Sequence, residues 1–322
     1  MKSTVISSGA AALAGAHDFS FVSDPGYCGP ALEIEHAYYK QWPTGIAVSS
    51  TGRKFSNYPG GLDLTNVCNG SNNVFTVGGL TSVTTETAYP SLKINQPPGG
   101  AINYTTSPPS RVLTPDGQLV YTAYGGPKLV RVDLSTDQVF KTIVFTQTVA
   151  YSNSYLNDVR FDLREEVSES GEGIAYVTDS SFEGRNGIII VDLGSGKSWR
   201  HSDIAHPVSQ STILPGVMPL SDLPIGSDGI ALSADVERLF WVPLASRYLY
   251  SIATSLLRAR GQTSELLAQS GVQSHGEKGA SDGFETDSNG YIYFGNNENN
   301  AVNFFNPKNG TVVPFVWDPR IN

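Results

Sequence analysis

A unit of four short predicted strands recurs along this chain of 322 residues. The last copy covers residues 279–316, where aromatic and β-branched residues such as those at 291–294 are typical of strands. Asp, Asn and Gly residues separate the four segments and indicate tight turns. Four antiparallel strands joined by short turns form a β-meander, which is the repeating unit, or blade, of one class of all-β folds.

The spacing of the copies predicts the fold. The third strand of a copy ends at Asp133, at Asp192 and again at Asn306, each time before a polar turn. The first two positions lie 59 residues apart, and the third lies 114 residues further, which corresponds to two repeats of 57. Five copies cover most of the chain, so the sequence predicts an all-β protein whose residues 17–322 form a single β-propeller domain of four-stranded blades.

Two segments depart from the repeat. In the fourth copy, residues 254–260 have the composition of a short helix, which is expected to replace the last strand. Upstream of the first copy, residues 17–40 mix aromatic residues with proline and glycine. This segment could close the ring by adding a strand to the last blade.

The charge of the chain argues against several classes of partner. The formal net charge is −9, the isoelectric point is near 5.0, and no cluster of Lys and Arg is present. Nucleic acid and anionic membrane surfaces are therefore not expected as partners. No apolar run approaches the roughly 20 residues that a membrane-spanning helix needs.

Three weak signals together favour the secretory route. Residues 1–16 resemble a short signal peptide that ends in the small-x-small pattern of Ala14 and Ala16, and a disordered tail is the alternative. Cys28 and Cys68 fit a secreted protein with one disulfide. N-glycosylation sequons begin at Asn69, Asn103 and Asn309.

The predicted fold would bring polar residues into one ring. In a propeller the first strand of each blade lines the central channel, so the residues that enter these strands should meet there. The residues at these entries are Thr44, Arg111, Asn157, Asp158, Asp228 and Asp282. The loops between second and third strands should open on the same face and supply Tyr58, Tyr124, Phe182, Arg247 and Asn297. An aromatic funnel with a polar floor is the usual form of a small-molecule site.

Three members of the ring are the candidate catalytic residues. Arg111 is its only cation, and a guanidinium can polarise a carbonyl or hold an enolate or phenolate. Asp158 and Asp282 would act beside it, and the other residues of the funnel would bind the substrate. The structural alternative is a salt bridge from Arg111 to Asp158 or Asp228, with each Asp bonded only to its neighbouring loop.

The sequence contains no motif for a cofactor. A Gly-x-Ser-x-Gly elbow, a dinucleotide fingerprint and a zinc-type Cys/His cluster are all missing from it. We therefore expect a protein without cofactor or metal. A lactonase-type hydrolase, which needs a metal in the channel held by Glu, Asn and Asp, ranks below the other functions because no Glu can be assigned to the ring.

Several segments resemble the yellow and major royal jelly proteins, in particular their fungal branch. The resemblance runs from about Trp42 to the end of the chain, and its strongest segments are residues 43–48, 157–160, 175–180, 198–200, 229–233, 243–246 and 279–283. Residues 298–301 and 317–320 add to it. The resemblance implies a secreted propeller of six blades with a ligand site at the mouth of its channel. The family continues past the segment at 318–320 into a final blade, which leaves the blade count here open.

The resemblance implies several functions. Insect members include dopachrome-converting isomerases, amine-binding salivary proteins and nutritional proteins, whereas some similar fungal proteins join an o-quinone methide to a polyene by a hetero-Diels–Alder reaction. The expected function is therefore a cofactor-free cyclase of secondary metabolism that binds an aromatic or polyene substrate. The alternatives are a secreted binding protein without turnover and a dopachrome-type isomerase.

The predicted disulfide can be tested directly. A bond between Cys28 and Cys68 closes a loop of about 40 residues, and the lost chain entropy should stabilise the folded protein by roughly 4 kcal/mol, less any strain. Intact mass measured without reductant should be two hydrogens lighter than after reduction. Two free thiols in the unreduced, secreted protein would contradict the pairing.

Overall fold

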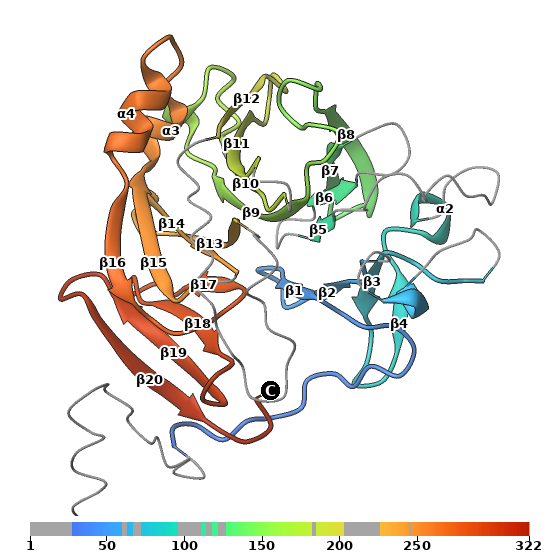
Figure 1. Cartoon of the computed structure of the whole chain (residues 1–322). Helices are drawn as coiled ribbons and strands as arrows, with labels where there is room; N and C mark the ends of the chain where they lie inside the picture. The colour runs from blue at the N-terminus through green and yellow to red at the C-terminus, as the bar shows by residue number, and fades with distance from the viewer. Residues whose placement is uncertain are drawn as a thin grey trace, which may run out of the picture.

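The computed structural model describes residues 28–59, 63–66, 72–95, 111–113, 118–121, 127–181, 185–202, 226–244 and 246–321; for 111–113 and 118–121 it describes the backbone alone. These residues form five antiparallel sheets of four strands each. Figure 1 shows the sheets arranged around a common centre, with the first strand of each sheet innermost. The prediction of an all-β propeller with five readable blades is confirmed.

Each sheet is formed by four strands that are consecutive in the chain. The strands of the first sheet are β1 (Gly45–Val48), β2 (Lys54–Asn57), β3 (Val77–Leu80) and β4 (Glu86–Ala88). Those of the second are β5 (Arg111–Leu113), β6 (Gln118–Tyr121), β7 (Lys128–Asp133) and β8 (Gln138–Val144). Those of the third are β9 (Leu156–Asp162), β10 (Ile174–Asp179), β11 (Gly187–Asp192) and β12 (Ser198–His201).

The last two sheets follow the same order. The fourth contains β13 (Ser227–Leu232), β14 (Arg238–Pro243), β15 (Tyr248–Ala253) and β16 (Gln273–Glu277). The fifth contains β17 (Phe284–Thr286), β18 (Ile292–Asn296), β19 (Ala301–Asn306) and β20 (Thr311–Trp317). The described helices are short: η1 (Leu64–Asn66), α2 (Leu92–Asn95), η2 (Glu165–Val167), α3 (Thr254–Arg258) and α4 (Ser264–Ser270).

Side chains on both faces of the central sheets are buried. Along β11, Ile189 and Val191 pack against the second sheet, whereas Ile188 and Ile190 pack against the fourth. All four side chains are completely buried, because alternate residues of a strand point to opposite faces. Similar clusters lie between the first and second sheets and between the fourth and fifth sheets. Four apolar cores therefore hold five sheets together.

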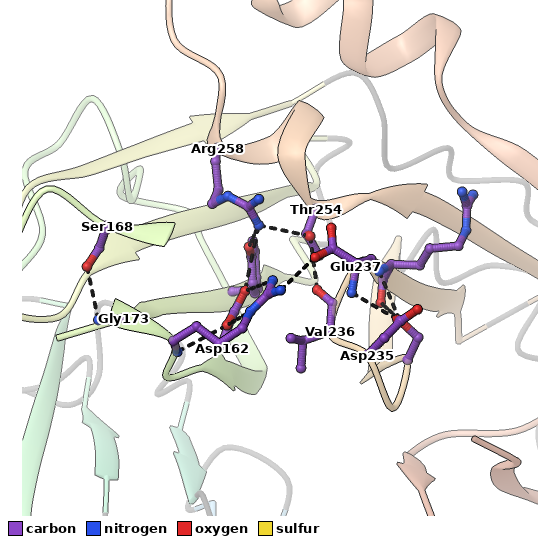
Figure 2. A network of polar contacts seen from close by, with 12 residues as sticks. Asp162, Ser168, Gly173, Asp235, Val236, Glu237, Thr254 and Arg258 are labelled. Carbon is purple, nitrogen blue, oxygen red and sulfur yellow. Dashed lines mark hydrogen bonds and ion pairs between the residues drawn. The ribbon is translucent and has the colours of Figure 1, made fainter. Parts of the chain in front are cut away.

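A polar network joins the third and fourth sheets beside their core (Figure 2). Arg164 donates two hydrogen bonds to the carboxylate of Asp162, at 2.9 and 2.8 Å, and a third of 2.6 Å to Glu237 in the β13–β14 turn. Thr254, the first residue of α3, donates to the Val236 carbonyl at 3.0 Å. Because Asp162 is buried, this network fixes the end of β9 against the neighbouring sheet.

The helical prediction for residues 254–260 is correct in part. A helix, α3, does begin at Thr254, but α4 and then β16 follow it, and β16 pairs with β15 as the fourth strand. The helices are therefore an insertion between two strands and do not replace the last strand. The prediction missed β16 because its sequence, Gln-Ser-His-Gly-Glu, lacks the apolar alternation of a half-buried strand.

The N-terminal part of the described chain, residues 28–44, forms a strap between the fifth and first sheets (Figure 1). At one end, Cys28 exchanges two backbone hydrogen bonds with Trp317 in β20, at 3.2 and 2.8 Å. At the other end, Ala37 donates to the Val83 carbonyl, and His36 contacts Glu86 at 3.2 Å. Among the described residues, the strap adds one isolated bridge to the last blade and not the additional strand that was expected.

Other predictions lie partly outside the described residues. These include residues 1–16, Cys68, and the sequons at Asn69 and Asn103. Cys28 is exposed and forms no disulfide within the described part of the chain, so its pairing with Cys68 stays a prediction. A sixth blade is not among the described sheets, and the six-blade count is not confirmed. None of the helices in the described ranges is long and apolar enough to cross a membrane.

A substitution in one interface tests the packing argument. Ile190→Ala removes a completely buried side chain between the third and fourth sheets and should lower the free energy of unfolding by about 2–5 kcal/mol. Leu266→Ala, at a side chain of α4 that is 65% exposed, should change it by less than about 0.5 kcal/mol. Denaturant titration of the two variants would measure both changes. Equal effects would contradict the assignment of Ile190 to an interface core.

Candidate functional site

A cavity of about 760 Å³ lies where the innermost strands meet, and we name it the channel cavity. The polar residues that line it, which we call the polar wall, are Thr44, Asn57, Asn157, Asp158, Arg160, Asp282 and Glu285. Its apolar wall consists of Ile46, Val48, Tyr293 and Val302. The volume falls within the usual range for small-molecule sites, and both polar and apolar residues line the cavity.

The predicted entry residues do meet at this cavity. Thr44, Asn157, Asp158 and Asp282 line it directly. Asp228 is buried immediately behind them, where it accepts hydrogen bonds from the side-chain amide of Asn157 and, at 3.1 Å, from the Ser180 hydroxyl. The close approach of β13 and β17 requires a glycine at 229, since a Cβ atom there would lie 2.0 Å from the Asp282 carbonyl oxygen.

Asp228 and Asp282 form a hydrogen-bonded pair of carboxyl groups. Burial, followed by the negative charge of Asp282, raises the pKa of Asp228 well above its ordinary value of 3.8. Burial also raises the pKa of Asp282, and the hydrogen bond from Asp228 partly offsets this rise. Two carboxylates in contact cannot both ionise easily, so the pair holds its last proton to a higher pH than an isolated aspartate would. Asp282 lines the channel cavity, and Asp228 lies buried behind it.

A buried lysine lies beside this pair. The Lys278 ammonium donates to the Gly279 carbonyl at 2.9 Å and to the Ser281 hydroxyl, and it lies 5.1 and 4.9 Å from the ring centroids of Phe284 and Phe294. Burial lowers the pKa of Lys278 to about 7, against the opposing effect of the charges on Glu298 and Asp282. Its charge in turn favours the ionised form of Asp282.

Arg160 is a cation on the cavity wall that was not among the predicted site residues. Its guanidinium contacts the Asp158 carboxylate at 2.6 Å and donates to the Phe284 carbonyl, so it reaches from the third sheet to the fifth. Its Nε is buried and has no hydrogen-bond partner among the described residues. Residues two apart on a strand point to the same face, so the position of Arg160 after Asp158 was a usable signal.

Arg247, which was predicted to line the funnel, forms an ion pair elsewhere. Arg247 donates to both carboxylate oxygens of Glu298, at 3.0 and 2.9 Å, and is not among the residues that line the channel cavity. Asn297 is exposed and also lies outside the lining.

Tyr58 does not form the wall of a funnel, contrary to its predicted position. Its side chain is completely buried, and its hydroxyl donates to Glu86 at 2.7 Å inside the first sheet. The partners of Tyr58 come from distant parts of the chain, which explains why the strand pattern did not reveal its burial. Tyr124, Phe182 and the side chain of Arg111 lie outside the described residues, although the backbone places Arg111 at the start of the inner strand β5.

No group of three or more His, Cys, Asp or Glu side chains in the described ranges is arranged to hold a metal ion. The carboxylates at the channel instead have protein partners. Asp158 accepts hydrogen bonds from the Val159 and Ile230 amides at 2.8 and 3.3 Å, besides its contact with Arg160. Burial nevertheless raises the pKa of Asp158.

Fold and cavity together fit a β-propeller that binds small molecules. A family profile described as major royal jelly protein matches residues 118–312, which is more than half of the chain. The protein therefore belongs to the major royal jelly protein family. No curated protein matches its sequence significantly.

Solved structures of other proteins share the fold. A chain of a nidogen/laminin complex matches with a TM-score of 0.50 at 11% identity, covering 87% of this chain and 81% of the other. Virginiamycin B lyase from Staphylococcus aureus matches with a TM-score of 0.45 at 12% identity, covering 86% of this chain and 70% of the lyase chain. A gluconolactonase from Xanthomonas campestris matches with a TM-score of 0.46 at 14% identity, covering 87% of this chain and 78% of the gluconolactonase chain. At such identities the likeness concerns the fold alone.

The shared proton makes stability depend on pH. The pKa of Asp228 is raised in the folded protein above its ordinary value of 3.8, so the contribution of this group to stability should fall as pH rises from about 4 through the raised pKa. In Asp228→Asn the side-chain amide can still accept a hydrogen bond from Asn157 and donate one to Asp282, but it does not titrate. Thermal midpoints measured between pH 4 and 8 should therefore fall less in Asp228→Asn than in the natural protein. An identical fall in both proteins would contradict the shared proton.

Proposed function

We propose that this protein is a cofactor-independent enzyme that binds an aromatic, quinone-like small molecule in the channel cavity and isomerises or cyclises it. One observation carries the proposal: Asp282 lines the cavity in contact with the buried Asp228, and burial raises the pKa of both carboxyl groups. A carboxylate whose pKa is raised is a stronger base at neutral pH than an exposed one, which suits general acid–base catalysis.

An isomerisation would use the two sides of the polar wall. Asp282 would accept a proton from a carbon or oxygen of the substrate and return it to another position, so the substrate would change its structure and not its composition. During the transfer, negative charge would develop on a carbonyl oxygen of the substrate. Arg160 supports this step, because its guanidinium carries a positive charge on the lining of the cavity.

Cyclisation of the hetero-Diels–Alder type is the second candidate. It requires no base, because two new bonds form while the electrons of diene and alkene rearrange. A donor on the ketone oxygen would stabilise the charge that develops there, and an apolar wall would hold the polyene in reacting geometry. The observation that favours this alternative is that Arg160 lines the same cavity as the apolar residues Ile46, Val48 and Tyr293. Arg111 stays a proposed donor for the same oxygen.

The secretory route remains part of the proposal. Asn309 is exposed in the turn between β19 and β20, where its side chain accepts hydrogen bonds from Thr311, the last residue of the sequon. A glycan attached there would extend from the surface of the fifth sheet.

The products would distinguish the candidate functions. The protein should be incubated with phenolic and quinone-like metabolites, alone and with polyenes, in the presence of a chelator, and the mixture read by mass spectrometry. Isomerisation yields a product of unchanged mass and new retention time, whereas cyclisation of two partners yields the sum of their masses. Ligand-induced thermal stabilisation without any product would favour a binding protein.

Asp282→Asn tests the base. Once a substrate is found, this variant should reduce isomerisation by about 10²–10⁴, because general base catalysis contributes a factor of that order. The control is Glu277→Gln, which makes the same chemical change at an exposed position outside the cavity lining and should leave turnover unchanged. Full activity in Asp282→Asn would exclude the base and favour cyclisation.

A further inference from the structure

We propose that Lys278 is a positioning residue for the proposed base: its buried ammonium group orders the segment at residues 279–284 and thereby holds the carboxylate of Asp282 at the channel cavity. Lys278 is not among the residues that line the cavity, so it would act through Asp282. The role therefore rests on the proposed function, in which Asp282 is the base, and adds a residue that does not touch the substrate.

The ammonium group of Lys278 is enclosed by the segment that follows it in the chain. Lys278 is only 4% exposed, and its Nζ donates hydrogen bonds to the Gly279 carbonyl, at 2.9 Å, and to the Ser281 hydroxyl. The ring centroid of Phe284 lies 5.1 Å from the same nitrogen. One buried cation therefore contacts a short stretch of chain at three points, and Asp282 lies between the second and the third.

The backbone of this segment has a defined path from the ammonium group to the cavity. It turns at Gly279, whose φ of +95° lies in the left-handed region that favours glycine. At the next residue, the Ala280 amide donates to the Glu298 carboxylate at 3.2 Å, and the Ala280 carbonyl accepts from the Asn297 amide at 3.2 Å. The segment is therefore held by the buried cation and by the loop after β18, and it carries Asp282 to the cavity lining.

The charge of Lys278 is not neutralised by a carboxylate in direct contact, because no described residue forms an ion pair with it. The acidic groups that act on it are Glu298 and Asp282, whereas Glu277, on its own strand, is exposed. Both carboxylate oxygens of Glu298 are held by Arg247, at 3.0 and 2.9 Å. The charge of Lys278 is therefore left to act on Asp282, whose ionised form it favours.

The effect of Lys278 on Asp282 can be measured without a substrate. In protein labelled with carbon-13 at the aspartate carboxyl groups, the resonance that is lost in Asp282→Asn belongs to Asp282, and its titration gives the pKa. Lys278→Met replaces the ammonium group by an apolar side chain of similar length, so the pKa of Asp282 should be higher in this variant than in the natural protein. The same pKa in both proteins would overturn the proposal.

Hydrogen–deuterium exchange tests the order of the segment. Backbone amides at residues 279–284 should exchange faster in Lys278→Met than in the natural protein, while those of β11 stay unchanged. The matched control is Lys308→Met, the same chemical change at an exposed lysine in the turn between β19 and β20, which should alter neither the exchange nor the pKa of Asp282. Unchanged exchange at 279–284 in Lys278→Met would contradict the positioning role. If Lys278→Met does not fold, Lys278→Gln keeps a donor for Ser281 without the charge and should still raise the pKa of Asp282.

Turnover separates this role from the proposed function. Lys278→Met should lower kcat by about 10–10²-fold, because a displacement of roughly 1 Å at a reacting group can cost that much, and should change KM by less than about threefold. The acid limb of its pH profile should move to higher pH, since Asp282 must be ionised to act as a base. If Asp282→Asn is inactive but Lys278→Met is fully active with an unmoved acid limb, the base stands and the positioning role is wrong. Full activity in Asp282→Asn would overturn both.

Discussion

The structure depends on the burial of both faces of its sheets. A single strand such as β11 supplies Ile189 and Val191 to one interface and Ile188 and Ile190 to the next, so every interior sheet is held from two sides. Apolar burial of this kind is the dominant favourable contribution to folding. This packing also determines the position of the innermost strands, because sheets packed face to face around a centre bring their first strands together there. The channel residues are therefore positioned by packing that lies far from them.

The same arrangement explains the chemistry of the polar wall. Inner strands approach so closely at Gly229 and Asp282 that carboxyl groups from two sheets come into contact. Burial and the charge of Asp282 raise the pKa of Asp228, whereas the hydrogen bond from Ser180 opposes this rise and the charge of Lys278 favours the ionised form of Asp282. A solvent-exposed aspartate would show no such shift, so the raised pKa values are a direct result of sheet packing.

The repeat predicted the propeller and the ring of entry residues, because both depend on local strand and turn patterns that recur. Asn157, Asp158, Asp228 and Asp282 come together as expected. The roles of individual side chains were harder to predict. Tyr58 is buried by a partner 28 residues away, and Lys278 is enclosed by the rings of Phe284 and Phe294. Such partners depend on tertiary contacts that no strand period encodes. The position of Arg160 at the site could have been predicted, because Arg160 follows Asp158 by two residues and such residues of a strand point to the same face.

The strap at residues 28–44 has a mechanical consequence. Between the first and fifth sheets, the described chain supplies the strap and the cavity, and no shared apolar core. Changing the separation of these two sheets would therefore bend a short segment and leave the ladder hydrogen bonds within each sheet in place. The other interfaces resist such a change, because moving their sheets apart would open a close-packed core. Within the described chain, the separation of the first and fifth sheets is thus set by the backbone hydrogen bonds of the strap and not by a packed core.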